Sequence, residues 1–258
     1  VGHNPRFWDA GIEYASASKE VSKSLPFSLF KTWAKCGTML AHESPNLATA
    51  YFRASPIVIP ILRQKHISSW ANLGKAMYKG SWKSSILASK FFDVSPMLVR
   101  DIPFWDLETF SSIIEQLSQK SYDLAMECLT IGEKVLGSLG QNRAGFLSLC
   151  KALIDNHPQE IKGCLESVPI SLASIDINIQ RRLIDLSKRL SISRVKNTSQ
   201  FLTAASKSIK LTNLREQGYI LDLSENLYDI SPVAVPAFLN NLEQVLNRIT
   251  PDQLDSWF

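Results

Sequence analysis

The amino-acid sequence predicts an all-α protein, an α-α superhelix of the armadillo-like or HEAT-like solenoid class with about six to seven helical repeats of 36 to 40 residues. Three observations lead to this prediction. The chain aligns with itself at a nearly constant offset, apolar residues recur at three- and four-residue spacing, and Ser-Pro pairs separate the apolar stretches. A constant offset is typical of stacked helical units, and the apolar spacing is that of one helix face.

The repeat is clearest between residues 30–62 and residues 67–102. The first three aligned pairs stand 37 residues apart and the last two stand 40 apart: Trp33 with Trp70, Gly37 with Gly74, Ser44 with Ser81, Phe52 with Phe92, and Ser55-Pro56 with Ser95-Pro96. Phe110 and Phe146 continue the aromatic position into a third and a fourth unit. Because each unit of such an array contacts only its neighbours, the number of repeats replaces the usual count of domains.

We therefore expect one solenoid domain over residues 1–258, with a divergent unit at 1–27, clear repeats at 28–140 and degenerate repeats at 141–258. Residues 249–258 resemble the entry to another unit, with Trp257 at the position of Trp33. We expect the chain to be a fragment of a longer protein, since a polar capping helix usually closes such an array.

Each unit is predicted to hold two main helices and a short third segment, as at residues 57–62. Serine can cap the start of a helix, and proline suits its first turn, so Ser-Pro pairs are predicted to mark turns. The predicted turns are Ser44-Pro45, Ser55-Pro56 and Ser95-Pro96, with Asn156-His157-Pro158 and Ser231-Pro232 as variants. Trp33 and Trp70 are expected to fill the core between helices.

No motif of catalysis, cofactor binding or metal binding is found in the sequence, so we assign no residue to these roles. The four histidines have no i, i+4 pair, and no phosphate-binding or dinucleotide-binding glycine pattern occurs. Asp101 and Asp106 flank Trp105, and a carboxylate near aromatic rings can act as a general base. A simpler interpretation is that Asp106 caps the helix that starts near Leu107.

The cysteines and the apolar runs indicate a soluble, cytoplasmic protein that does not enter a membrane. Cys36, Cys128, Cys150 and Cys164 form no Cys-x-x-Cys pair and lie within apolar helical patterns. We expect them to be buried, reduced thiols. No apolar run approaches the roughly 18 to 20 residues that span a bilayer.

Charge is unevenly distributed along the chain, although its net charge is only +4. Residues 179–215 hold nine basic side chains and one acidic one, whereas residues 216–258 hold seven acidic side chains and one basic one. Such a segment could bind phosphate groups or steer a charged partner, although a solvated face is the simpler interpretation. The nine basic residues are Arg181, Arg182, Lys188, Arg189, Arg194, Lys196, Lys207, Lys210 and Arg215.

Four sequence stretches resemble the helical repeat region of von Willebrand A-domain proteins of the nitric-oxide-reductase-activation type, relatives of Rubisco-activation accessory proteins. They are residues 50–56, Ala-Tyr-Phe-Arg-Ala-Ser-Pro; residues 67–74; Ser81-Trp82; and residues 91–96, Phe-Phe-Asp-Val-Ser-Pro. The resemblance is good over residues 30–140. It implies a repeat module whose partner is a MoxR-type AAA+ ATPase or its client metalloenzyme.

The adhesion domain of that family is missing from this sequence, because no Asp-x-Ser-x-Ser motif occurs. The strings at Asp185 and Asp222 lack the last serine. The resemblance therefore transfers no metal ligand and no other functional residue.

We expect a non-enzymatic scaffold for protein–protein interaction, with the adaptor role that the resemblance implies. The first alternative is a nucleic-acid-binding or base-repair solenoid that uses the basic segment 181–215, which strong salt dependence of binding would favour. A second alternative is an enzyme whose pocket lies between helices.

Overall fold

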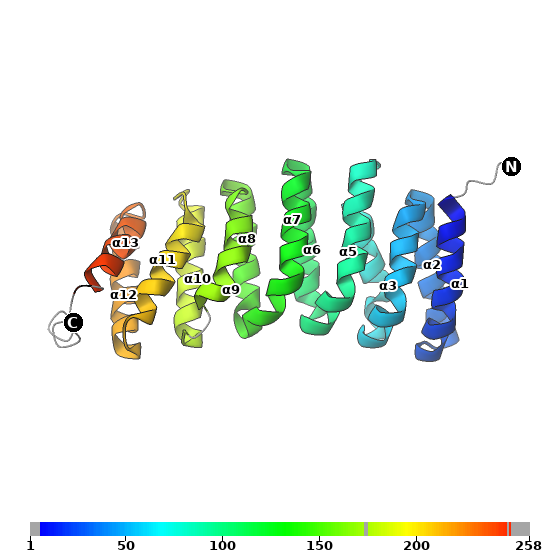
Figure 1. The fold of residues 1–258 in the computed structure, drawn as a ribbon, viewed down its shortest axis with the longest axis horizontal. Coiled ribbons are helices and arrows are strands. Elements are labelled where there is room, and N and C mark those ends of the chain that lie inside the picture. Colours follow the sequence, from blue (N-terminus) through cyan, green and yellow to red (C-terminus); the bar gives the residue numbers. More distant parts are fainter. Residues whose placement is uncertain (1–5, 173–174, 247, 249–258) are drawn as a thin grey trace. The chain divides into compact units, whose positions relative to one another are not determined.

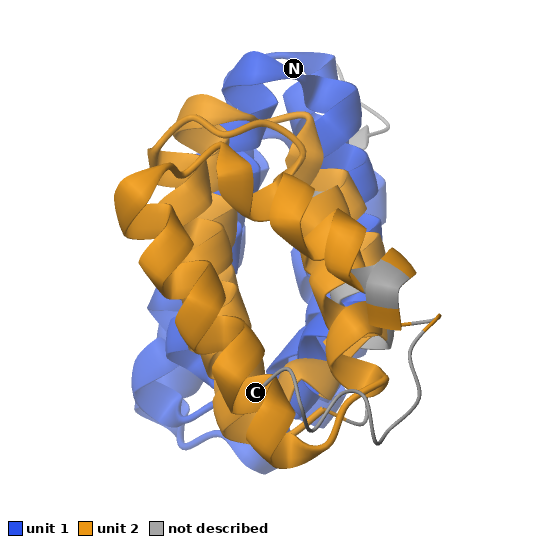
Figure 2. Ribbon diagram, turned by 90° about the vertical axis from the view of Figure 1, so that its left-hand side faces the viewer, with its two compact units in different colours: residues 1–137 blue, residues 138–258 orange. Residues whose placement is uncertain are grey.

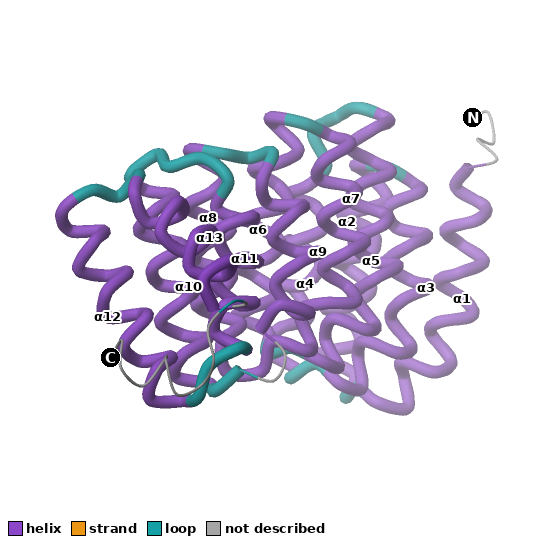
Figure 3. The backbone as a smooth tube through the Cα atoms, turned by 60° about the vertical axis from the view of Figure 1, so that its left-hand side comes forward, coloured by secondary structure: helices purple, strands orange, loops and turns teal. Residues whose placement is uncertain are grey.

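The computed structural model describes residues 6–172, 175–246 and 248. Within these residues every regular element is helical and no strand occurs (Figure 1, Figure 3). The prediction of an all-α protein is confirmed. The stretch around Trp257 lies outside the described residues. The chain divides into two compact units, residues 1–137 (unit 1) and 138–258 (unit 2), which Figure 2 colours separately.

Unit 1 consists of helices that pack in two layers. Helices α1, α3, α5 and α7 contact one another in that order, and α2, α4 and α6 do the same behind them (Figure 1). Successive helices α2–α3, α4–α5 and α6–α7 form hairpins that join the layers. The elements are α1 (Arg6–Ser24), α2 (Phe27–Glu43), α3 (Pro45–Ile61), the 3-10 turn η1 (Gln64–His66), α4 (Ile67–Met77), α5 (Trp82–Asp101), α6 (Phe104–Lys120) and α7 (Tyr122–Val135).

The 3-10 segment η2 (Leu136–Asn142) includes the first residues of unit 2, whose helices repeat the packing scheme. Helices α9, α11 and α13 contact in order, as do α8, α10 and α12, and the hairpins are α8–α9, α10–α11 and α12–α13. The elements are α8 (Arg143–Asn156), α9 (Glu160–Leu172), α10 (Ile177–Ile192), α11 (Thr198–Lys210), α12 (Leu214–Ile230) and α13 (Ala234–Leu246).

The tryptophans of the first two clear units are fully buried, as predicted. Each indole N–H donates a hydrogen bond to a buried serine of the next helix, Trp33 to Ser55 at 2.8 Å and Trp70 to Ser95 at 3.0 Å. These bonds satisfy a donor that would be costly to bury alone. The serine hydroxyls in turn donate to the carbonyls of Tyr51 and Phe91.

The turns predicted at Ser55-Pro56 and Ser95-Pro96 are wrong, because both pairs lie inside helices, α3 and α5. The predicted third segment at residues 57–62 is wrong for the same reason, since α3 continues to Ile61. An internal proline costs roughly 3 kcal/mol. Burial of large side chains on both sides of each proline offsets this cost: Tyr51, Phe52, Val58 and Ile59 in α3, and Phe91, Phe92, Val94 and Leu98 in α5.

The other predicted turns are confirmed. Ser44 separates α2 from α3, His157 follows α8, and Ser231 follows α12. Two capping predictions are wrong. The Ser44 hydroxyl makes no cap bond and instead hydrogen-bonds the Ser85 hydroxyl at 2.8 Å, and Asp106 lies within the first turn of α6, where Pro103 stands at the cap position.

All four cysteines are buried, as predicted. Burial raises the pKa of the Cys36 thiol, because the thiolate would lose its hydration. In the part of the chain that the structure describes, no helix is both long and apolar enough to cross a bilayer.

Candidate functional site

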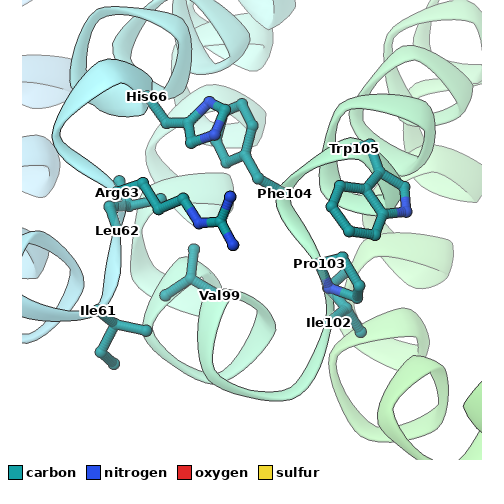
Figure 4. Close-up of a pocket in the computed structure, with 9 residues that line it drawn as sticks. All are labelled: Ile61, Leu62, Arg63, His66, Val99, Ile102, Pro103, Phe104 and Trp105. Atoms are coloured by element: carbon teal, nitrogen blue, oxygen red, sulfur yellow. The ribbon is translucent and has the colours of Figure 1, made fainter.

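A pocket of about 220 Å³ opens in unit 1 beside two successive helix connections (Figure 4). One connection joins α3 to η1 and contributes Ile61, Leu62, Arg63 and His66; the other joins α5 to α6 and contributes Ile102 and Pro103, with Val99, Phe104 and Trp105 next to it. We call this site the aromatic pocket.

Local backbone preferences shape the connection between α5 and α6. Pro103 has its φ fixed near −59°, and the residue before a proline avoids helical conformation, so Ile102 is extended and α5 ends at Asp101. In the other connection Leu62 and Arg63 are also extended before η1 begins. The walls of the aromatic pocket are therefore fixed by short extended links between helices.

Stacked rings and aliphatic side chains form the walls. The His66 and Phe104 rings stack with centroids 4.2 Å apart and an interplanar angle of 26°. Leu62 and Ile102 are buried, whereas Ile61 is partly exposed. Because the rings and aliphatic groups converge on one small space, the pocket can hold an apolar group.

Trp105 stands on the rim with 64% of its surface exposed. Helix periodicity explains this, since Asp106, Leu107 and Phe110 occupy the buried face of α6 and leave Trp105 on the opposite side. The Trp105 indole has no hydrogen-bond acceptor and no ring partner among the described residues. It contrasts with Trp33 and Trp70, whose indoles are bonded and buried.

Arg63 gives the pocket its charge. Its side chain extends into the space between Val99 and the His66–Phe104 stack (Figure 4). No carboxylate lines the pocket, and Arg63 has no ion-pair partner among the described residues. The other arginine side chains described in unit 1 differ: Arg53 lies 3.3 Å from Glu13, and Arg100 lies 2.9 Å from Asp101.

A second, wider depression of about 410 Å³ crosses α1, α3, α5 and α7. Arg53 joins Glu13 at 3.3 Å and Asp93 at 3.8 Å across it, and these three residues stand 40 positions apart in the sequence. Burial raises the pKa of Asp93, and Arg53 and then Lys90 partly oppose this effect. Arg53, the arginine of this depression, is thus already paired with carboxylates, and we do not select the depression as the binding site.

The basic segment predicted from the sequence is partly neutralised within unit 2. Arg182 lies 2.6 Å from Asp222 and 3.0 Å from Glu225. Arg189 lies 2.7 Å from Asp229, and its guanidinium stacks on the Tyr228 ring. The acidic helix α12 therefore packs against the basic helix α10, and the charge imbalance along the sequence is reduced in space.

The remaining basic residues do not gather in one place. Arg194 and Lys196 lie in the connection between α10 and α11, whereas Lys207 and Lys210 lie in the last turn of α11. At 1.5 Å per residue, the part of α11 between Thr198 and Lys207 is roughly 14 Å long, which exceeds the screening length of about 8 Å at physiological salt. The basic residues of the predicted segment therefore lie at opposite ends of the α10–α11 hairpin. Arg181 and Lys188 lie on α10, and Arg215 contacts the Tyr219 hydroxyl in the first turns of α12.

Sequence reasoning missed the aromatic pocket. It singled out Trp105 only as a neighbour of Asp101 and Asp106, and it selected neither Arg63 nor His66. One usable signal was present: Leu107, Phe110 and Ile114 recur at three- and four-residue spacing and define the buried face of this helix, and Trp105 does not fall on that face.

Among the described residues, no group of three or more histidine, cysteine, aspartate or glutamate side chains could hold a metal ion. Comparison with protein-family models, with curated proteins and with solved structures finds no match to this chain.

Proposed function

We propose that this chain is a non-enzymatic protein-binding scaffold, an α-solenoid that captures a partner through the aromatic pocket. The observation that carries this proposal is Trp105, a large apolar side chain that is 64% exposed beside a preformed pocket. Tryptophan and arginine are the residue types most enriched among the side chains that dominate binding energy at protein interfaces.

The packing scheme supports the solenoid. Within unit 1 and within unit 2, helices two positions apart along the chain contact one another, and so do the two helices of each hairpin. Contacts limited to near neighbours are typical of repeat arrays, whose surfaces commonly serve as binding platforms.

The chemistry of the pocket favours binding over catalysis. Its lining side chains include one guanidinium and one imidazole but no carboxylate, hydroxyl or thiol. Nucleophilic catalysis needs a nucleophile within reach of a base, and the lining pairs its one imidazole with no hydroxyl, thiol or carboxylate. The proposed partner, which the family resemblance implies, is a MoxR-type AAA+ ATPase or its client metalloenzyme in the cytoplasm.

The test is capture of partners by the immobilised full chain from nuclease-treated lysate, with Trp105→Ala and Trp82→Ala compared side by side. Trp82 is 71% exposed at the start of α5 and does not line the pocket, so it is the matched control. We expect one set of proteins to be retained by the wild type and by Trp82→Ala and lost from Trp105→Ala. Equal retention by both variants would refute binding at the pocket.

The alternative function, nucleic-acid binding, is tested in the same assay. It would use the exposed ends of the α10–α11 hairpin, where Arg194 and Lys196 lie. If nuclease-free lysate yields nucleic acid whose retention falls steeply with salt and with Arg194→Gln plus Lys196→Gln, the basic segment is the binding site.

A further inference from the structure

We propose that the aromatic pocket recognises a peptide segment in which one large apolar side chain stands next to a carboxylate. This inference rests on the proposed function and names the chemistry of the ligand. It follows from the size of the pocket, from its unmatched charge and from the orientation of its aromatic side chains.

The size of the pocket limits the occupant to one side chain. Its volume of about 220 Å³ is smaller than the roughly 300 to 1,000 Å³ of cavities that enclose a drug-sized ligand. The buried residues Leu62 and Ile102 and the ring of Phe104 supply apolar contacts. A phenylalanine, leucine or tryptophan side chain of a partner would bury itself there.

The charge of Arg63 determines which group of the ligand is favoured next to its apolar side chain. Arg63 points into the pocket, and no carboxylate balances it among the described residues. Of the arginine side chains described in unit 1, Arg53 and Arg100 have carboxylate partners within 4 Å. Arg63 has none, so its guanidinium is available to bind the carboxylate of a ligand. A guanidinium binds a carboxylate through two parallel N–H donors, which fixes orientation as well as charge.

The rim supplies a third contact. The six-membered ring of the Trp105 indole lies on the side of the pocket, and 64% of the residue is exposed, so it can cover the backbone of a bound peptide (Figure 4). A peptide presents an apolar group and an acid within a few bonds of one another.

The experiment measures binding of short fluorescein-labelled peptides to the full chain by fluorescence anisotropy. The probes have a central phenylalanine flanked by aspartate and glutamate, the same peptide with asparagine and glutamine in place of the acids, and the acidic peptide with alanine in place of phenylalanine. We expect the first probe to bind best and both replacements to weaken binding by about five-fold or more, in line with the loss of one ion pair or one anchor side chain.

Variants of the chain separate the two contacts. Arg63→Gln should lower the affinity for the acidic probe about five-fold and that for the amide probe less than about two-fold. Trp105→Ala should lower the affinity for both probes about ten-fold. Trp82→Ala and Arg53→Gln are the matched controls, since Trp82 and Arg53 lie outside the pocket, and they should bind as the wild type does. Unchanged helical content and melting of each variant show that the fold is intact.

Equal binding of the acidic and amide probes, or binding of a mononucleotide in place of the peptides, would overturn the inference. If lysate capture depends on Trp105 but no acidic probe binds, the ligand chemistry proposed here is wrong and the scaffold function stands. If neither the lysate capture nor the peptides depend on Trp105, both proposals fail.

Discussion

The hairpins α4–α5 and α6–α7 are neighbours in unit 1 but fill their interiors differently. In α4–α5 the Phe92 ring of the second helix covers Gly74 of the first, and Trp70 lies beside it with its N–H bonded to Ser95. In α6–α7 the arrangement is reversed: Phe110 of the first helix covers Gly132 of the second. Phe110 stands 40 residues after Trp70, and Gly132 stands 40 after Phe92.

This difference shows what the packing requires. In these two hairpins one ring lies against one glycine, where the helices approach too closely for a larger residue, and either helix can supply the ring. The tryptophan and the serine change together, since Val135 stands 40 residues after Ser95. An indole N–H needs an acceptor, whereas a phenylalanine ring does not. The sequence repeat therefore weakens in the third unit although the hairpin is retained.

The largest expected effect comes from removing the tryptophan itself. Trp70→Ala should lower the free energy of unfolding by about 3 to 5 kcal/mol, because a fully buried ring is replaced by a cavity. Urea denaturation followed by circular dichroism measures it. The exposed Trp82 provides the control, and Trp82→Ala should change the stability by less than about 0.5 kcal/mol. Similar losses for the two variants would contradict the burial of Trp70.

Substitutions at the glycine positions are expected to cause the second-largest loss of stability. A Cβ added at Gly74 would overlap the tip of the Phe92 ring, and one added at Gly132 would overlap that of Phe110. Gly74→Ala and Gly132→Ala should each cost about 1 to 3 kcal/mol, which exceeds the gain in helix propensity of at most about 1 kcal/mol.

Two further variants test whether contact with the ring causes the cost of each glycine substitution. Phe92→Leu should reduce the cost of Gly74→Ala but not that of Gly132→Ala, since only the first pair is in contact. Gly11→Ala is the control: nothing lies within 4 Å of the added Cβ in α1, so alanine should stabilise the helix by about 0.5 to 1 kcal/mol. Stabilisation by Gly74→Ala would show that the Phe92 ring can move away from the added Cβ without loss of stability.

Apolar spacing and Ser-Pro pairs differed in how well they predicted the fold. The buried tryptophans followed from apolar spacing, because that spacing reports directly on which face is buried. Ser-Pro pairs predicted the turn at Ser44 correctly. The pairs Ser55-Pro56 and Ser95-Pro96 misled, because local propensity predicts a break that tertiary burial of the flanking rings overrides.

The aromatic pocket could not be predicted, because it depends on two segments that the sequence keeps about 40 residues apart. Arg63 and Trp105 belong to different helix connections, and only the packing of α3, α5 and α6 brings them to one space. Likewise, the basic segment and the acidic stretch after it look separate in the sequence, whereas Arg182 and Glu225 are ion-paired in the structure.

The smallest expected effect concerns the coupling of tryptophan and serine. Ser95→Ala removes the acceptor of the Trp70 N–H, which should cost about 1 to 3 kcal/mol because a buried donor is left without a partner. In a Trp70→Phe background the same substitution should cost less than about 1 kcal/mol, because no N–H remains to be satisfied, as at Phe110. A double-mutant cycle measured by urea denaturation gives the coupling, expected at about 1 to 2 kcal/mol. Equal costs in both backgrounds would mean that Ser95 contributes only through its bond to the Phe91 carbonyl, and that the joint loss of tryptophan and serine in α6–α7 has no energetic cause.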